Sequence, residues 1–190
     1  CKENNSFGVT TLQKKHIKII KNNVVIDFNG KKNVRNTCKI KNKKIIRTLR
    51  EKRRTLNNDD NIFTYRIKNK YHKIQSKDVN DYLKKFGDFS AKNFRTWGAN
   101  IEFIYQIVKS CQKEFPKNNN EIKRTLNDCI KVVAHKLHNT TSVCKSNYLD
   151  PELINLLEVN PKNFLELFNM NKINKDKLVY KYIHFLKSLI

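Results

Sequence analysis

Four residue types suited to phosphate transfer occur in order along this chain of 190 residues. Lys31 ends the segment FNGK, Arg95 lies within KNFRTWG at 92–98, and Asn139 precedes Tyr148 by nine positions. A tyrosine hydroxyl can attack phosphorus and form a covalent intermediate. An arginine fork and an amide donor can stabilise charge on the phosphate oxygens, and a lysine can protonate the leaving oxygen. This set can break and rejoin a phosphodiester.

A less specific interpretation exists for each of these residues. Tyr148 is one of seven tyrosines and Lys31 is one of 40 lysines and arginines, so packing or solubility could explain either. Arg95 could be an exposed helical arginine, although its neighbours Phe94 and Trp97 favour an arginine flanked by core residues. The order and spacing of the set, more than any single residue, favour phosphate chemistry.

The segment 143–151, VCKSNYLDP, and the spacing from Asn139 to Tyr148 resemble the type IB DNA topoisomerases, most closely the small poxvirus-like branch. The resemblance extends from GVTTL at 8–12 to the tail after Tyr148. It implies an enzyme that relaxes supercoiled double-stranded DNA through a 3′-phosphotyrosyl intermediate and religation. It also implies that neither ATP nor a metal is required as a cofactor.

The resemblance assigns a role to each residue of the set. Tyr148 would be the nucleophile, Arg95 would bind the non-bridging phosphate oxygens, and Lys31 would be the general acid for the departing 5′-oxygen. Asn139 matches the position where the poxvirus enzymes use His and several relatives use Asn. Lys92, one helical turn before Arg95, matches a lysine that often assists proton transfer.

His138 is an alternative to Asn139, because a shift of one residue in the match would exchange their roles. The nine-residue spacing to Tyr148 favours Asn139.

The chain departs from the family in one respect. The family's catalytic set contains a second arginine, on a helix that precedes the element matched here by Gly8–Leu12. No arginine precedes Gly8 here. We therefore expect residues 1–190 to be a catalytic domain that is incomplete at its N-terminus and impaired on its own. The alternative is that the chain is inactive. The full protein would be a monomer that closes as a clamp on DNA with a further N-terminal domain.

The net charge of +23 indicates a polyanionic partner, with nucleic acid favoured over a membrane surface. Residues 1–75 carry 21 Lys and Arg against 5 Asp and Glu, a net charge of +16, so this part should supply much of the phosphate-binding surface. A Lys-rich chain from an AT-rich genome is the alternative explanation of this composition.

The five cysteines are scattered and form no CxxC pair, which favours free thiols in a reducing, intracellular compartment. The nucleus, a viral particle and DNA-containing cytoplasm all remain open. No apolar run approaches the roughly 20 residues of a membrane span.

The sequence predicts an α+β fold for the elements that position these candidate site residues. A small N-terminal β-hairpin sheet is followed by a mainly helical body. The strand-rich part covers about 6–45, and the helical part about 76–190. Strands are expected over 8–12, 16–19, 24–28 and 34–40. Asn29-Gly30 is a strong hairpin signal that would place Lys31 at a tip. The basic stretch 41–54 could be a helix or a solvated arm.

Helical periodicity begins near Ser76. It predicts a first helix ending near Gly87, a long one capped by Ser90, and a third running from Glu121 to about Leu137. A break at 139–142 would start a new helix before Tyr148. Pro151 and Pro161 would each open another short helix, and 176–190 would form the last.

Two rival functions remain open. A tyrosine recombinase shares the fold and nucleophile, but it usually has His-x-x-Arg where this chain has Lys92 and Arg95. A non-enzymatic basic module would bind nucleic acid by counterion release alone. A metal nuclease is disfavoured, because the only adjacent acids, Asp59 and Asp60, form no carboxylate cluster in the sequence.

Overall fold

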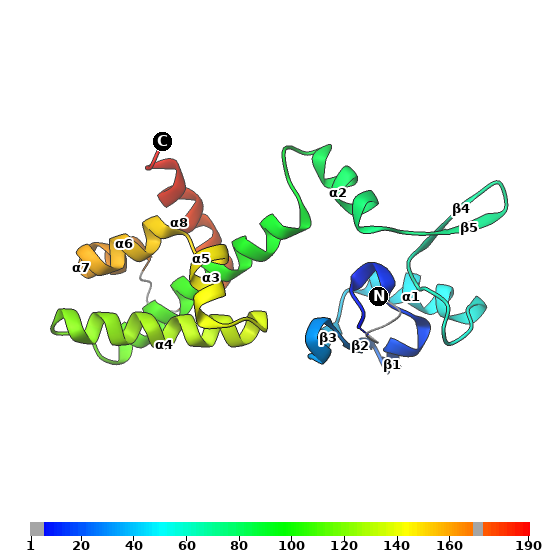
Figure 1. Cartoon of the computed structure of the whole chain (residues 1–190), viewed down its shortest axis with the longest axis horizontal. Coiled ribbons are helices and arrows are strands. Elements are labelled where there is room, and N and C mark those ends of the chain that lie inside the picture. The colour runs from blue at the N-terminus through cyan, green and yellow to red at the C-terminus, as the bar shows by residue number, and fades with distance from the viewer. Residues whose placement is uncertain (1–5, 169–172) are drawn as a thin grey trace. The chain divides into compact units, whose positions relative to one another are not determined.

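The structure is a computed structural model that describes residues 6–168 and 173–190. The chain divides into two compact units, Cys1–Phe89 and Ser90–Ile190, which are described separately (Figure 1).

The first unit combines a three-stranded sheet, one long helix and a separate two-stranded hairpin. Its elements in chain order are η1 (Val9–Thr11), η2 (Lys14–His16), β1 (Ile17–Ile20), β2 (Asn23–Asn29), η3 (Lys31–Asn33), β3 (Arg35–Ile40), α1 (Lys43–Thr55), β4 (Thr64–Ile67), β5 (Lys70–Lys73) and α2 (Ser76–Lys84), where η is a 3₁₀ helix. Strands β1, β2 and β3 pair antiparallel in that order, with Ile17 opposite Ile26 and Val24 opposite Ile40.

The core of the first unit lies between this sheet and α1. Ile17 and Val24 are fully buried, and they cluster with Ile46 and Leu49, the two buried residues of α1. Ile46 and Leu49 lie three positions apart, so they form one apolar stripe on an otherwise basic helix. Stretch 41–54 is therefore a docked helix, begun by Asn42, whose side chain accepts hydrogen bonds from the Lys44 and Ile45 amides.

In the second unit, the regular secondary structure of the described residues is all helical. It contains α3 (Ala91–Lys113), α4 (Asn119–Leu137), α5 (Thr141–Tyr148), α6 (Pro151–Val159), α7 (Pro161–Phe168) and α8 (Lys175–Lys187). The centre of its core is the fully buried face of α3 at Phe103, Ile104 and Ile107.

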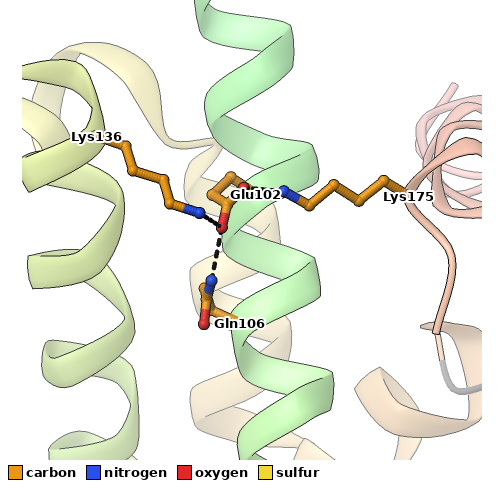
Figure 2. A network of polar contacts seen from close by, with 4 residues as sticks. All are labelled: Glu102, Gln106, Lys136 and Lys175. Atoms are coloured by element: carbon orange, nitrogen blue, oxygen red, sulfur yellow. Dashed lines mark hydrogen bonds and ion pairs between the residues drawn. The ribbon is translucent and has the colours of Figure 1, made fainter.

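Glu102 joins three helices of this unit through its carboxylate (Figure 2). One oxygen, at 2.5 Å from the Lys136 ammonium on α4, also accepts from Gln106, and the other accepts from Lys175 on α8. The Glu102 side chain is only 12% exposed. Burial by itself would raise the pKa of Glu102, but the hydrogen bonds from Lys136, Lys175 and Gln106 outweigh it, so the net pKa is lowered.

The predicted α+β class, with a small antiparallel sheet and a mainly helical body, is confirmed. The division between the units falls after Phe89, so α2 groups with the sheet although the helical part was expected from about 76. The hairpin β4–β5 was not predicted.

Two local predictions were wrong. Segment 8–12 is not a strand but contains the 3₁₀ turn η1, because the Thr11 hydroxyl accepts from the Gly8 amide and donates to the Gly8 carbonyl. Helix α4 starts before Glu121, since Asn118 accepts a hydrogen bond from the Glu121 amide and acts as its N-cap.

The thiols of Cys38, Cys111, Cys129 and Cys144 are free, as predicted, and Cys1 lies outside the described residues. Burial raises the pKa of Cys129 to about 12, which keeps this thiol protonated. Over 6–168 and 173–190, none of the helices has the length and apolar character needed to cross a membrane.

Candidate active site

Tyr148 is the last residue of α5 and lies partly buried against the core of the helical unit. Helix α5 begins at Thr140, whose hydroxyl accepts from the Val143 amide. It ends where Leu149 turns into extended backbone and buries its side chain. Because Thr140 caps one end of this short helix and the buried Leu149 side chain anchors the other, the position of Tyr148 is fixed.

Arg95 contacts both segments that were expected to contribute to the site. Its guanidinium carbon lies 5.2 Å from the centroid of the Tyr148 ring. The same guanidinium donates a hydrogen bond to the Leu137 carbonyl, in the last turn of α4. Its side chain is exposed, so the fork is open to a ligand from solvent. A phosphate bound by Arg95 would therefore lie close to the Tyr148 ring.

Asn139 and His138 have different environments although they are neighbours. His138 adopts the left-handed conformation with φ of 54° and forms the C-cap of α4. The Asn139 amide donates to the Ala134 carbonyl at 2.9 Å, which completes this helix end. The side-chain nitrogen of Asn139 is buried and has no hydrogen-bond partner. Leaving a buried donor without a partner costs free energy, so this amide is a candidate to bind an oxygen atom of a ligand in the site.

Asn100 is a site residue that the sequence did not single out. It is 2% exposed, and its side-chain nitrogen donates to the Tyr148 carbonyl at 3.1 Å and to the Thr96 carbonyl at 3.1 Å. Its side-chain oxygen accepts from the Asp150 amide at 2.8 Å. Asn100 therefore holds the backbone on both sides of Leu149. The only sequence signal was a polar residue inside an apolar helical run.

Asp150 extends this hydrogen-bond network to the buried side chain of Tyr182. One carboxylate oxygen accepts from the Glu152 amide and caps α6, and the other accepts from the Tyr182 hydroxyl at 2.9 Å. The Tyr182 ring lies 4.9 Å from that of Trp97. Burial, and then the Asp150 carboxylate, raise the pKa of Tyr182, so this phenol remains a proton donor.

The neighbours of Arg95 correct one expectation. Trp97 is partly buried and packs against the core, but Phe94 is 60% exposed. Arg95 is thus not flanked by core residues on both sides, because the apolar face of α3 turns away from solvent only from Trp97 onward. Ser90 is the N-cap residue as predicted, but its hydroxyl donates to the Asn93 side chain and makes no cap bond to the helix.

Lys31 lies exposed at the tip between β2 and β3, in the first unit. Gly30 makes this tip tight. Its amide donates to the Val34 carbonyl at 2.7 Å, and a Cβ atom there would meet the Asn36 side chain at 2.6 Å. Lys31 lies at a hairpin tip, as predicted, but Asn29-Gly30 is not the turn: Asn29 still pairs with Arg35, and the 3₁₀ segment Lys31–Asn33 turns the chain.

The structure therefore brings part of the predicted set together. Arg95 contacts Tyr148 directly, and Asn139 lies two residues beyond the carbonyl that Arg95 binds. Lys92 is exposed in the first turn of α3, one turn before Arg95. Lys31 belongs to the other unit, so its approach to Tyr148 stays a prediction.

Comparison with known proteins identifies the family to which this chain is similar. The family model described as the catalytic core of eukaryotic DNA topoisomerase I matches residues 1–176. The chain is 29% identical to DNA topoisomerase 1B of Acanthamoeba polyphaga mimivirus, over 92% of this chain and 53% of that protein. It is 28% identical to DNA topoisomerase I of Monkeypox virus and to DNA topoisomerase 1B of Vaccinia virus strain Copenhagen, over 98% of this chain and 55% of each relative.

The chain thus spans about half the length of these relatives. Because the family model covers most of the 190 residues, the chain belongs to the family of the eukaryotic DNA topoisomerase I catalytic core.

Proposed function

We propose that this chain is the catalytic part of a type IB topoisomerase that relaxes supercoiled double-stranded DNA. The observation that carries the proposal is the position of Arg95, 5.2 Å from the Tyr148 ring and hydrogen-bonded to the end of α4 that leads to Asn139. A charged fork, an unpaired amide donor and a phenol are thus supplied by three neighbouring segments, which fits attack by a tyrosine on a phosphodiester.

In the proposed reaction the Tyr148 oxygen bonds to phosphorus and gives up its proton to solvent water. The bond from phosphorus to the 5′-oxygen breaks, and that oxygen takes a proton and leaves as a 5′-hydroxyl. Tyr148 is then joined to the 3′-phosphate, and attack by the 5′-hydroxyl reverses the step. Because one phosphodiester replaces another, the exchange needs no ATP.

The remaining residues handle charge and protons in this proposal. Arg95 and Asn139 bind the non-bridging oxygens, where charge grows in the transition state. Lys31 protonates the departing 5′-oxygen, and Lys92 assists. We also propose that no metal is required, and that the full protein acts as a monomer closing around DNA with a further domain. The relatives are longer than the matched segment, which leaves room in them for such a domain.

Covalent capture on a suicide duplex in EDTA without ATP tests this proposal. The full-length protein that contains these residues should become joined to the 3′-phosphate side of the labelled strand. The Tyr148→Phe variant should form no adduct but bind DNA normally, because only the nucleophilic oxygen is lost. Tyr180→Phe is the control, since it removes the hydroxyl of an exposed tyrosine on α8.

An adduct on the 5′-phosphate side, undiminished adduct from Tyr148→Phe or a strict need for Mg²⁺ would contradict the proposal. Residues 1–190 alone should form less adduct, because no arginine precedes Gly8. Loss of one charge-stabilising donor lowers a rate by about 10²–10³.

A further inference from the structure

The hairpin β4–β5 is a regular two-stranded ribbon. Four antiparallel pairs join its strands, from Thr64 opposite Lys73 to Ile67 opposite Lys70. Lys68 and Asn69 form the two-residue turn, and their φ angles of 43° and 63° are those of a type I′ turn, which matches the twist of the strands.

Both faces of this ribbon are open. Because side chains alternate, Tyr65 and Ile67 lie on one face with their partners His72 and Lys70, and Tyr71 lies on the other. Tyr71 is 70% exposed, and every residue of the two strands except Thr64 is exposed. An isolated two-stranded hairpin is only marginally stable in water. Exposed rings and an apolar side chain on such a ribbon indicate a surface used for binding.

The charge of the ribbon identifies the kind of partner. Residues 61–77 contain Arg66, Lys68, Lys70, Lys73 and Lys77 and no acid. Cations and aromatic rings lie together on the ribbon: the Arg66 guanidinium lies 5.9 Å from the Tyr71 ring centroid, and the Tyr65 and His72 rings stack at 5.5 Å. This combination suits a polyanion that also offers flat apolar groups, as nucleic acid does.

We propose that the β4–β5 ribbon inserts into the major groove of duplex DNA, with its cations on the phosphates and its rings against base edges. A major groove about 12 Å wide admits a two-stranded β-ribbon, whereas a minor groove about 6 Å wide does not. The choice of duplex DNA as the partner rests on the proposed function. The ribbon binds DNA and takes no part in the chemistry at Tyr148.

Two ribbon variants and one control test this inference on the 190-residue chain. Tyr71→Ala should weaken binding to a 30-bp duplex about tenfold, the loss expected for one base contact. In the double variant Arg66→Gln with Lys70→Gln, the plot of log association constant against log salt concentration should be shallower by about 1.8. Each lost phosphate contact contributes about 0.9 to this slope. Tyr180→Ala, which removes a ring that is 75% exposed on α8, should change neither.

Dimethyl sulfate footprinting then locates the ribbon, because guanine N7 lies in the major groove and adenine N3 in the minor groove. Wild type should protect a patch of guanine N7 atoms that Tyr71→Ala exposes. Unchanged N7 protection, or protection only at adenine N3, would overturn the inference. A lowered melting temperature of Tyr71→Ala without DNA would also overturn it, since the ribbon would then be packing on protein.

The result is separable from that of the proposed function. If Tyr148 forms no adduct but N7 protection still depends on Tyr71, the enzymatic proposal fails and the ribbon stands. If the full-length ribbon variants form adduct at saturating DNA with wild-type footprints, the ribbon proposal fails and the enzymatic one stands.

Discussion

At the scale of single residues, the candidate site depends on side chains that hold Tyr148 as much as on those that would touch phosphate. Asn100 binds the Tyr148 carbonyl and the Asp150 amide from one buried amide group. A nucleophile must be aligned with phosphorus, and a shift of about 1 Å can lower a rate by about 10²-fold. Asn100 is therefore a positioning residue of the proposed reaction.

Replacing Asn100 should slow cleavage without weakening DNA binding. Asn100→Ala should lower the single-turnover rate at saturating DNA by about 10–100-fold, because it removes buried hydrogen bonds worth about 1–3 kcal/mol. Asn100→Asp keeps an acceptor for the Asp150 amide but loses the donor to the Tyr148 carbonyl. The assay is run below the melting temperature of every variant. Equal rates for all three proteins would show that Asn100 serves folding alone.

Asn139 and His138 can be separated by paired substitutions. Asn139→Ala should lower the cleavage rate by about 10²–10³, the usual loss for one charge-stabilising donor. His138→Gly should keep the rate and raise the melting temperature, because glycine adopts a φ of 54° without strain. Rates from quenched-flow capture and calorimetric melting check both. The assignment of Asn139 is wrong if His138→Gly is the slower variant.

At the scale of elements, Glu102 connects α3, α4 and α8 by ion pairs (Figure 2). Lys175 also lies 4.7 Å from the Tyr105 ring centroid, so the start of α8 is held by charge and by a ring. Tyr182, which binds Asp150 beside the nucleophile, lies later on the same helix. The docking of α8 thus supports the backbone next to Tyr148.

Glu102→Gln should destabilise the helical unit by about 1–3 kcal/mol at neutral pH, because two ammonium groups lose a partly buried partner. The folded pKa of Glu102 lies below its ordinary value of 4.5, so its contribution is present above that pH and is lost as pH falls through the folded pKa. Melting curves from pH 7 to pH 3 should therefore converge for the two proteins at the acid end. Glu158→Gln, on the exposed part of α6, is the control. A constant difference across this range would contradict the assigned role.

At the scale of the whole molecule, charge is distributed unequally along the chain. Residues 1–75 carry a net charge of +16 out of a total of +23. This region contains the sheet that presents Lys31, the basic helix α1 and the β4–β5 ribbon. The first unit should therefore contribute most of the electrostatic affinity for DNA.

DNA affinity should accordingly fall steeply with salt. With about six phosphate contacts, the association constant should drop on the order of 10³-fold between 50 and 200 mM salt. Fluorescence anisotropy with a 30-bp duplex measures this, and melting at each salt concentration checks that the protein stays folded. A flat salt dependence would contradict binding by counterion release.

The sequence by itself determined the local features of this protein. Alternation indicated the β2–β3 hairpin with Lys31 at its tip, although the turn lies at Lys31–Asn33 and not at Asn29-Gly30. Helical periodicity with proline starts indicated the order of helices from α3 to α8. These features depend on neighbours within a few residues, which the chain displays directly. The resemblance around Tyr148 added the expected chemistry, and the match of residues 1–176 established the family.

Only the tertiary structure decided what surrounds the nucleophile. Arg95 meets a carbonyl 42 positions away and Asn100 one 48 positions away, and no local period encodes such distances. Periodicity also shows that a helix has an apolar face, but it does not show how much of that face other elements cover. Phe94 was therefore expected in the core although it is exposed. The β4–β5 ribbon was missed because its strands have only four residues each and bury neither face, and because its Lys68-Asn69 turn lacks the glycine that usually marks such a turn.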